Sequence, residues 1–291
     1  MTVKELINSY SKNISTNEVF LVLEKVLGKT KEQIIISLDD ELNENVSDII
    51  LNCFDALKDG YPVQYITGKQ EFMGLTFKAN EDVLIPQPDT EVVVEKAIEA
   101  INIYDFENDT MQELHVFNSM VDSDQKVIRI LDLCTGSGAI AISIANHFKN
   151  NINFHVDVTG SDVSLKALEV ARENAINNNV NIKLIESNMF EELDDQYDII
   201  VSNPPYIRTD VIETLDKNVQ CEPHIALDGG EDGLLFYRVI KANLDRLAQN
   251  GYLILEIGYD QADDIKKIFS NAKIYKDYGG NDRVAVIKKE E

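Results

Sequence analysis

The stretch DLCTGSGAIAISIANHF, residues 132–148, has three parts: the end of an apolar strand, a glycine-rich turn and an apolar helix. Gly136 and Gly138 allow the backbone of the turn to approach a ligand closely. The free N–H groups at the start of the helix favour polar or anionic ligand groups. The letters G-S-G-A-I-A also satisfy the dinucleotide-binding fingerprint, with alanine in the last position. A tight crossover without a ligand is the alternative interpretation.

Apolar segments typical of strands recur after this motif and alternate with helical patterns. This alternation predicts an α/β fold with a mostly parallel sheet that helices cover on both faces. The expected strands are 127–133, 154–160, 181–187, 197–203 and 251–258, with a last pair at 272–278 and 283–289.

The N-terminal part of the chain shows helical patterns and no convincing strand. We therefore expect residues 1–75 to form a small helical domain. Ser15 or Thr16 is expected to cap one helix, which stops at Gly28. A later helix is expected to start at Ser47.

Residues 71–86, EFMGLTFKANEDVLIP, alternate like a β-hairpin whose turn lies near Ala79-Asn80. We expect 76–90 to be a hairpin linker and 91–291 to be the main domain.

The helix that opens the main domain is expected to be capped by Asp89 or Thr90. Further on, residues 102–126 carry six acids and one base with weak periodicity. This segment is predicted to be a partly mobile surface excursion.

The overall composition narrows the class of protein. Its net charge of −24 argues against a general nucleic-acid binder, which would neutralise phosphates with lysine and arginine. An acidic chain suits a basic partner, although the charge can equally serve solubility. The three cysteines are odd in number and far apart, which fits a reducing cytoplasm: Cys53, Cys134 and Cys221. The four histidines lie at no metal-ligand spacing, so no metal is expected.

The N-terminal stretch MTVKELINSYSKNIS has the pattern of an amphipathic helix and not that of a leader. No apolar run approaches the roughly 18 residues that a membrane helix requires. We therefore expect a cytoplasmic protein without a membrane partner.

Asp162 ends the second expected strand, 24 residues after Gly138. An acid in this place can accept both hydroxyl groups of a ribose. The alternative is an N-cap for the helix that follows, because aspartate before a helix is often only a cap. Together with the glycine-rich turn, Asp162 favours a nucleoside site.

The stretch VSNPPYIR, residues 201–208, ends the fourth strand at the edge where open α/β sheets bind ligands. Asn203 precedes a proline and is therefore held extended. Its carboxamide oxygen can accept one hydrogen of an –NH₂ group, and the Pro204 carbonyl can accept the other. Tyr206 can cover a planar group by stacking. The motif predicts an acceptor clamp for a planar amine or amide; a strand terminator without function is the alternative.

From Tyr65 to its end, the chain resembles the bacterial peptide-chain release factor glutamine methyltransferases, the HemK/PrmC family. The stretches that carry the resemblance are EFMGLTFKANEDVLIPQPDTE, DLCTGSGAIAISIA, NPPYI, EPHIALDGGEDGLLFYRVI, GYLILEIGYDQ and KDYGGNDRVAVI. NPPY is shared with amino-directed nucleic-acid methyltransferases, whereas VLIPQPDTE is more specific to the glutamine branch. The resemblance implies a class I S-adenosylmethionine-dependent methyltransferase fold, Rossmann-like and seven-stranded, behind a helical domain.

The resemblance also implies roles for single residues. The implied cofactor is S-adenosylmethionine, with S-adenosylhomocysteine as product. The implied cofactor-binding residues are Cys134, Thr135, Gly136, Ser137, Gly138, Asp162, Asn188, Met189 and Asn203. The implied substrate-binding residues are Asn203, Pro204, Pro205 and Tyr206, of which Asn203 and Pro204 are the catalytic acceptors.

Four positions depart from the family pattern. Cys134 stands where glycine is frequent, and Gln87 replaces the usual arginine of IPRPDTE. Asn188 replaces a frequent aspartate, and Met189 stands where some members have an aromatic residue. These departures concern the residues that are assigned to the adenine and to the entrance of the substrate site.

The implied reaction is methylation of the glutamine side chain in the Gly-Gly-Gln motif of class 1 release factors. Domain 1–75 would recognise this protein substrate, or alternatively only stabilise the catalytic domain. A glutamine methyltransferase of a large-subunit ribosomal protein is the nearest alternative. An amino-methyltransferase of RNA or DNA bases and a cofactor-binding scaffold without turnover are the others.

Overall fold

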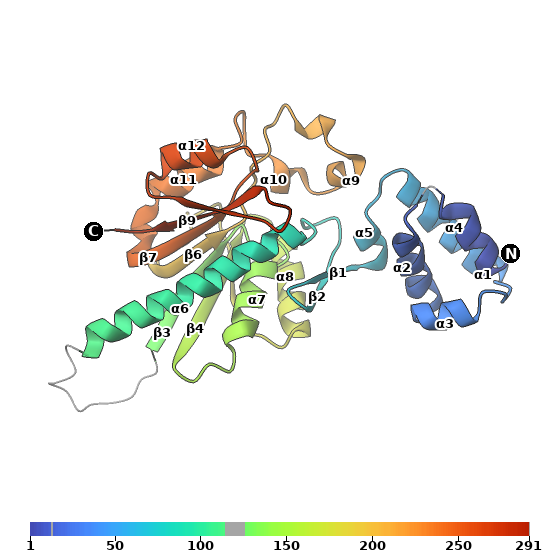
Figure 1. Ribbon diagram of the computed structural model, residues 1–291, viewed down its shortest axis with the longest axis horizontal. Coiled ribbons are helices and arrows are strands. Elements are labelled where there is room, and N and C mark those ends of the chain that lie inside the picture. Colours follow the sequence, from blue (N-terminus) through green and yellow to red (C-terminus); the bar gives the residue numbers. More distant parts are fainter. Residues whose placement is uncertain (13, 114–125, 291) are drawn as a thin grey trace.

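The structure is a computed structural model that describes residues 1–12, 14–113 and 126–290 (Figure 1). Its main sheet has seven strands in the order β5-β4-β3-β6-β7-β9-β8. The strands are β3 (Lys126–Leu133), β4 (Phe154–Asp162), β5 (Lys183–Glu186), β6 (Tyr197–Ser202), β7 (Leu247–Glu256), β8 (Lys273–Lys276) and β9 (Asp282–Lys288). Each expected strand is present. The β9 strand runs antiparallel to both neighbours, and the other pairings are parallel.

The strand order places a topological switch between β3 and β6. From β3 the chain continues outward through β4 and β5, then returns to β6 on the other side of β3. The last residues of these two central strands, Leu133 and Ser202, are paired in register. The two motifs of interest therefore leave the sheet side by side, at the crevice where α/β proteins bind ligands.

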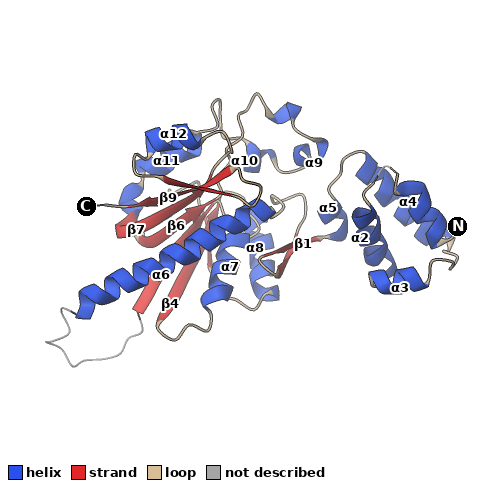
Figure 2. Ribbon diagram, in the orientation of Figure 1, coloured by secondary structure: helices blue, strands red, loops and turns tan. Residues whose placement is uncertain are grey.

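Helices cover both faces of the sheet, as Figure 2 shows. Side chains alternate along each strand: Ile128 and Ile130 point into one core, and Leu131 and Leu133 into the other. The first core is covered by α6 (Glu91–Glu113), α7 (Ala139–Phe148) and α8 (Leu165–Asn177); the second by α11 (Leu235–Ala242) and α12 (Ala262–Ile268). Burial on both faces explains why the strands read as nearly continuous apolar runs.

Five N-terminal helices form a separate core at one end of the molecule (Figure 1). They are α1 (Val3–Tyr10), α2 (Thr16–Leu27), α3 (Lys31–Ile36), α4 (Glu44–Lys58) and α5 (Val63–Thr67). Ser15 caps α2 in a capping box with Glu18, and Gly28 ends it in the left-handed conformation. The predicted start at Ser47 is wrong: α4 begins after Asn43, whose side chain accepts from Val46 N, and Ser47 is buried inside the helix.

The predicted hairpin exists but lies earlier in the chain. Its strands are β1 (Lys69–Phe72) and β2 (Leu75–Lys78), so its turn is Met73-Gly74 and not Ala79-Asn80. Both turn residues have positive φ, a conformation that suits a tight hairpin turn. The expectation of no strand before residue 75 is therefore wrong as well. The proposed division into 1–75, 76–90 and 91–291 stays a prediction.

The acidic segment is helical where the structure describes it. The α6 helix continues to Glu113, so the predicted surface excursion is wrong for residues 102–113. Tertiary partners hold this half of the helix: Tyr104 donates to Asp198 at 2.7 Å, and Lys288 pairs with Glu107 at 2.8 Å. Residues 114–125 lie outside the described residues.

Short helices connect the larger elements: η1 (Pro88–Thr90), η3 (Ile212–Thr214), α9 (Lys217–Gln220), α10 (His224–Leu227) and η4 (Leu244–Arg246). Within the described part of the chain, no helix combines the length and the apolar character that crossing a membrane requires.

Candidate active site

A pocket lies at the switch point, between the ends of β3, β4 and β6. It has about 730 Å³ of empty space, including its opening to solvent. Its walls are formed by Asp82, Val83, Leu84, Leu133, Cys134, Gly136, Asp162, Val163, Ser164, Ala167, Ser187, Asn188, Met189, Asn203, Pro205, Pro223, Ile225, Ala226 and Phe236.

The glycine-rich turn forms one wall, and a buried carboxylate holds it from below. Asp132 Oδ2 accepts from the Thr135 hydroxyl at 2.6 Å and from the Ala141 amide at 3.1 Å. Complete burial raises the pKa of Asp132 to about 7, against the lowering effect of these two bonds. Asp132 thus ties the turn to the start of α7.

Gly138 serves packing, whereas Gly136 faces the pocket. A Cβ on Gly138 would come within 2.9 Å of Ile142 and 3.2 Å of Ala171, so this glycine lets α7 and α8 approach. A Cβ on Gly136 would meet no atom within 4 Å, because the space beside it is the pocket itself. Both glycines have positive φ, which other residues adopt at a cost.

Asp162 joins the glycine-rich turn to the end of β4. Its Oδ2 accepts from Gly136 N and its Oδ1 from Ser164 N, both at 2.9 Å. The N-cap of α8 is Ser164, which accepts from Ala167 N, so the alternative of Asp162 as the cap is wrong. Burial raises the pKa of the Asp162 carboxyl above its usual value. The carboxylate retains lone pairs on the pocket side for a ligand hydroxyl.

Two strained residues meet opposite Asp162. Cys134 and Met189 both have positive φ, and the Cys134 thiol donates to the Met189 sulfur at 3.8 Å. Strained backbone of this kind gathers at functional sites. Burial raises the pKa of the Cys134 thiol, which stays protonated. Beside them, Asn188 donates its amide N–H to Glu191 at 2.9 Å, leaving its carbonyl oxygen to accept.

The NPPY turn forms the opposite wall. Asn203 Nδ2 lies 3.3 Å from Thr90 Oγ1 and donates to it, while no described residue donates to Asn203 Oδ1. The Tyr206 hydroxyl donates to Glu256 Oε1 at 3.1 Å. Tyr206 and Pro204 are not among the pocket walls; Tyr206 lines a neighbouring hollow with Arg208 and Arg283.

The 82–84 loop and the 223–226 segment both line the pocket and together form its roof. Glu222, almost completely buried, accepts from the Ile85 amide at 2.8 Å and joins the two segments. Its burial raises the pKa of the carboxyl to about 7. Val83 packs on Ala167 and Val170 of α8, which anchors the loop from the other side.

The charged side chains of the walls are acids. Asp82 and Asp162 contribute the carboxylates, and the wall residues include neither lysine nor arginine. Such walls favour a cationic or neutral nucleoside over a phosphate-bearing dinucleotide, which the fingerprint G-S-G-A-I-A left open. In the described residues, no group of three or more His, Cys, Asp or Glu side chains is placed to hold a metal ion.

The structure brings together most of the predicted site residues. Cys134, Gly136, Asp162, Asn188, Met189, Asn203 and Pro205 all line the pocket. Thr135, Ser137 and Gly138 lie behind the wall, where they shape the turn. Sequence reasoning missed Ser164, Ser187, the 223–226 segment and Phe236, and it missed Thr90 and Glu256 behind Asn203. Ser164 and Ser187 lie close to predicted site residues in the chain, whereas only the tertiary fold brings the others near.

Two family models match the chain. The model described as "Methyltransferase small domain" matches residues 115–221, and "PrmC N-terminal domain" matches residues 5–68. The second match ends where β1 begins, so it covers the N-terminal helices.

Several curated relatives carry one name. "Release factor glutamine methyltransferase" of Clostridium acetobutylicum is 36% identical, over 98% of this chain and 98% of its own length. Its namesake in Agrobacterium fabrum is 36% identical, over 92% and 89%. The namesake in Fusobacterium nucleatum is 45% identical over 78% of this chain, but the match spans only 60% of that relative.

A solved structure shows the same fold. The catalytic domain of hMettl16, in complex with a 3′UTR hairpin, superposes with a TM-score of 0.51, over 86% of this chain and 83% of that one. At 13% identity this likeness concerns the fold alone. The main domain thus has the class I methyltransferase fold that the sequence predicted.

Proposed function

This chain belongs to the family of release factor glutamine methyltransferases, and on that premise we propose that it methylates the side-chain amide of the glutamine in the Gly-Gly-Gln motif of class 1 release factors. The observation that carries the proposal is Asn203, which lines the switch-point pocket and whose Oδ1 receives no hydrogen bond from the described residues. The names of the relatives favour a release factor over a ribosomal protein or a nucleic-acid base as substrate.

The pocket residues fit S-adenosylmethionine. The open space beside Gly136 can take its amino-acid part, and the Asp162 carboxylate can accept from the ribose hydroxyls. Asn188 and Met189 can border the adenine with an acceptor oxygen and an apolar surface. The acidic walls suit its positive charge. When bound, the cofactor supplies an electrophilic methyl group on a sulfonium.

The glutamine substrate is unreactive by itself. Its carboxamide nitrogen is a poor nucleophile, because the nitrogen lone pair is delocalised into the carbonyl. Asn203 Oδ1 and the Pro204 carbonyl oxygen can each accept one N–H of the glutamine amide. Two acceptors raise the electron density on nitrogen and aim it at the pocket. Orientation of this kind contributes several kcal/mol to catalysis.

The site must also exclude water from the reacting groups. Val83 and Pro205 give apolar walls, so little solvent competes for the acceptors. The amide loses its proton only after the methyl group has been transferred, when the nitrogen carries a positive charge. That proton can leave to water, so the site needs no strong base beside NPPY.

The N-terminal helices are proposed to recognise the protein substrate, since a single glutamine side chain offers too little surface for specificity. The "PrmC N-terminal domain" match supports a family-specific role for them. The net charge of −24 suits a basic protein surface on the partner, in the cytoplasm.

The test is mass spectrometry of purified release factor after incubation with this protein and S-adenosylmethionine. Peptide mapping should find a methyl group on the glutamine of Gly-Gly-Gln, absent when Asn203→Ala replaces the wild type. A labelled methyl group on ribosomal protein or RNA, with none on the release factor, would keep the fold and discard the proposed substrate.

A further inference from the structure

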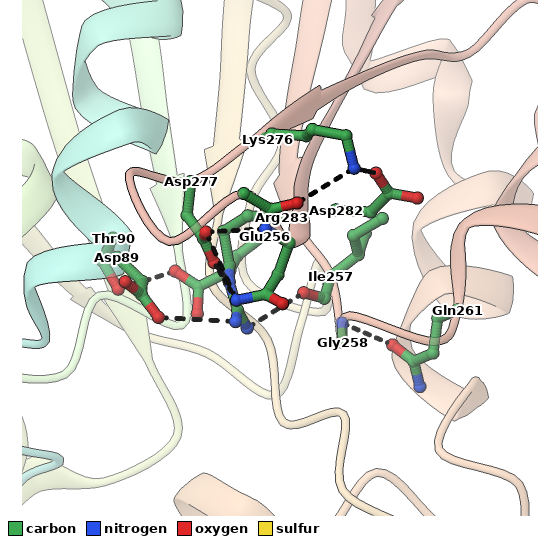
Figure 3. Close-up of polar contacts among 12 residues, drawn as sticks. Asp89, Thr90, Glu256, Ile257, Gly258, Gln261, Lys276, Asp277, Asp282 and Arg283 are labelled. Carbon is green, nitrogen blue, oxygen red and sulfur yellow. Dashed lines mark hydrogen bonds and ion pairs between the residues drawn. The ribbon is translucent and has the colours of Figure 1, made fainter.

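Glu256 is the last residue of β7 and is 2% exposed. Figure 3 shows its polar surroundings. One carboxylate oxygen, Oε2, accepts from the Thr90 hydroxyl at 2.6 Å. The other, Oε1, accepts from the Tyr206 hydroxyl at 3.1 Å. A single buried carboxylate therefore contacts both ends of the NPPY tetrapeptide: Tyr206 directly, and Asn203 through Thr90.

The hydrogen bonds along this path have a fixed direction. An ionised carboxylate only accepts, so the single proton of Thr90 Oγ1 points to Glu256. Thr90 can then offer only lone pairs to Asn203, which must approach with its NH₂ group. The amide of Asn203 consequently turns its Oδ1 away from Thr90, toward the pocket.

Surrounding charges favour the ionised carboxylate at neutral pH. Arg283 lies beside it, held by Asp277 at 3.1 Å and by Asp89 at 3.4 Å (Figure 3). Burial raises the pKa of Glu256 to about 6, while Thr90 and then Arg283 act to lower it. At pH 7.5 the acceptor form therefore predominates.

The strand does not need this side chain for its own pairing. Glu256 is joined to β9 through its backbone, in register with Val284, and its carbonyl oxygen accepts from the buried Tyr237 hydroxyl at 2.9 Å. The carboxylate is thus aimed away from the ladder, at the two side chains that flank the prolines. Burying a charge is costly unless it is paired and hydrogen-bonded, so the ionised Glu256 depends on Thr90, Tyr206 and the nearby Arg283.

We infer that Glu256 is a positioning residue for methyl transfer, which through Thr90 orients the Asn203 amide with its oxygen toward the substrate and through Tyr206 fixes the far end of the NPPY turn. This inference rests on the proposed function for its substrate. It concerns the orientation of an acceptor and not a contact with the glutamine itself.

Thr90 offers the matched variants. Thr90→Val keeps the shape and removes the relay, whereas Thr90→Ser keeps the hydroxyl. We expect Thr90→Val to lower kcat about 30- to 100-fold, since misplaced catalytic groups have effects of this size, and Thr90→Ser to stay within about threefold of wild type. The dissociation constant for S-adenosylmethionine should change less than about threefold in both. Thr76→Val, on an exposed threonine of β2, is the control.

Glu256→Gln completes the set. Because Gln carries a donor as well as an acceptor, it no longer forces the direction of the Thr90 proton, and kcat should fall at least about tenfold. Combined with Thr90→Val it should lower kcat by less than the product of the two single effects, because both changes break the relay through Thr90. Wild-type kcat in Thr90→Val or in Glu256→Gln would overturn the inference, as would a Thr90→Ser variant no better than Thr90→Val.

A second readout separates this inference from the proposed function. The side-chain ¹⁵N–¹H₂ signals of Asn203, measured with the cofactor product bound, report its bond to Thr90 without turnover. One slowly exchanging proton should be present in wild type and Thr90→Ser and lost in Thr90→Val. If the wild type methylates no release factor but shows this pattern, the substrate is wrong and the positioning stands. An unchanged signal in Thr90→Val would overturn the positioning.

Discussion

The glycine-rich turn after β3 and the NPPY turn after β6 leave neighbouring strands at one edge of the sheet, yet they are held differently. Asp132 and Asp162 hold the first turn, and they lie 3 and 26 residues from the groups that they bind. Thr90 and Glu256 hold the second turn, and they lie 113 and 50 residues from Asn203 and Tyr206.

This difference suggests a division of labour. The first turn is a local strand–turn–helix unit that can form its ligand cradle as soon as β3, β4 and α7 are in place. The second acquires its orientation only when β7 and the 87–90 segment reach it. Cofactor affinity should therefore depend on the first turn, and the rate of transfer on the second.

The largest expected effect is on the rate of methyl transfer. Asn203→Ala removes the acceptor oxygen and should lower kcat about 100- to 1,000-fold, the usual consequence of losing one preorganised hydrogen-bonding group. The dissociation constant for S-adenosylmethionine should stay within about threefold, measured by calorimetry. Asn181→Ala, on an exposed loop, is the control. A cofactor affinity that falls as far as kcat would erase the distinction between the two turns.

Gly136→Val should act mainly on the affinity for the cofactor. Its side chain fills the open space beside the turn and must adopt a positive φ, so we expect the dissociation constant for S-adenosylmethionine to rise about 30- to 100-fold. The rate of transfer at saturating cofactor should change far less. Gly74→Val, at an open positive φ in the hairpin turn, controls for backbone strain. Equal cofactor affinity in Gly136→Val and wild type would place the ligand elsewhere.

The pH dependence of the free energy of unfolding can be tested at Glu222, in the roof of the pocket. Its pKa of about 7 in the folded protein exceeds the value of about 4.3 in unfolded chains, so the folded state holds the proton more tightly. The free energy of unfolding should therefore fall as pH rises from about 4.5 to about 7, by on the order of 2–3 kcal/mol from this group.

Glu222→Gln cannot ionise and should not show this loss. Urea denaturation of the two proteins between pH 5 and 8 measures the difference, which should grow with pH in favour of the variant. Glu213→Gln, on an exposed residue, should run parallel to wild type. Parallel curves for Glu222→Gln and wild type would show that Glu222 is not protonated by burial.

The smallest effect is expected at Cys134, where φ is +62°. Cys134→Gly relieves the backbone and loses the contact with Met189. The free energy of unfolding should stay equal or rise by up to about 1 kcal/mol, measured by urea denaturation, with cofactor affinity unchanged. A loss larger than about 1 kcal/mol would show that the sulfur contact matters more than the strain.

The same contrast explains what could be predicted from the sequence. Periodic apolar runs located every strand of the main sheet, and the spacing of the glycine-rich turn and Asp162 placed one wall of the pocket. These signals are local or follow from a fixed strand order.

Tertiary contacts decided the rest. Asp89 or Thr90 was expected to cap the helix that follows, but both lie inside η1, where Asp89 pairs with Arg283 and Thr90 donates to Glu256. The acidic half of α6 looked like a loop, but Tyr104 and Glu107 bind partners on β6 and β9. Such partners lie too far away in the chain for a local pattern to reveal them.

The most direct test of the division of labour is a double-mutant cycle on Gly136→Val and Asn203→Ala. Cofactor dissociation constants and single-turnover rates at saturating cofactor are measured for wild type, both variants and their combination. If the two turns act separately, the effects add in each quantity, with a coupling energy below about 0.5 kcal/mol. A coupling of 1 kcal/mol or more in either quantity would contradict the account, because the turns would then work as one unit.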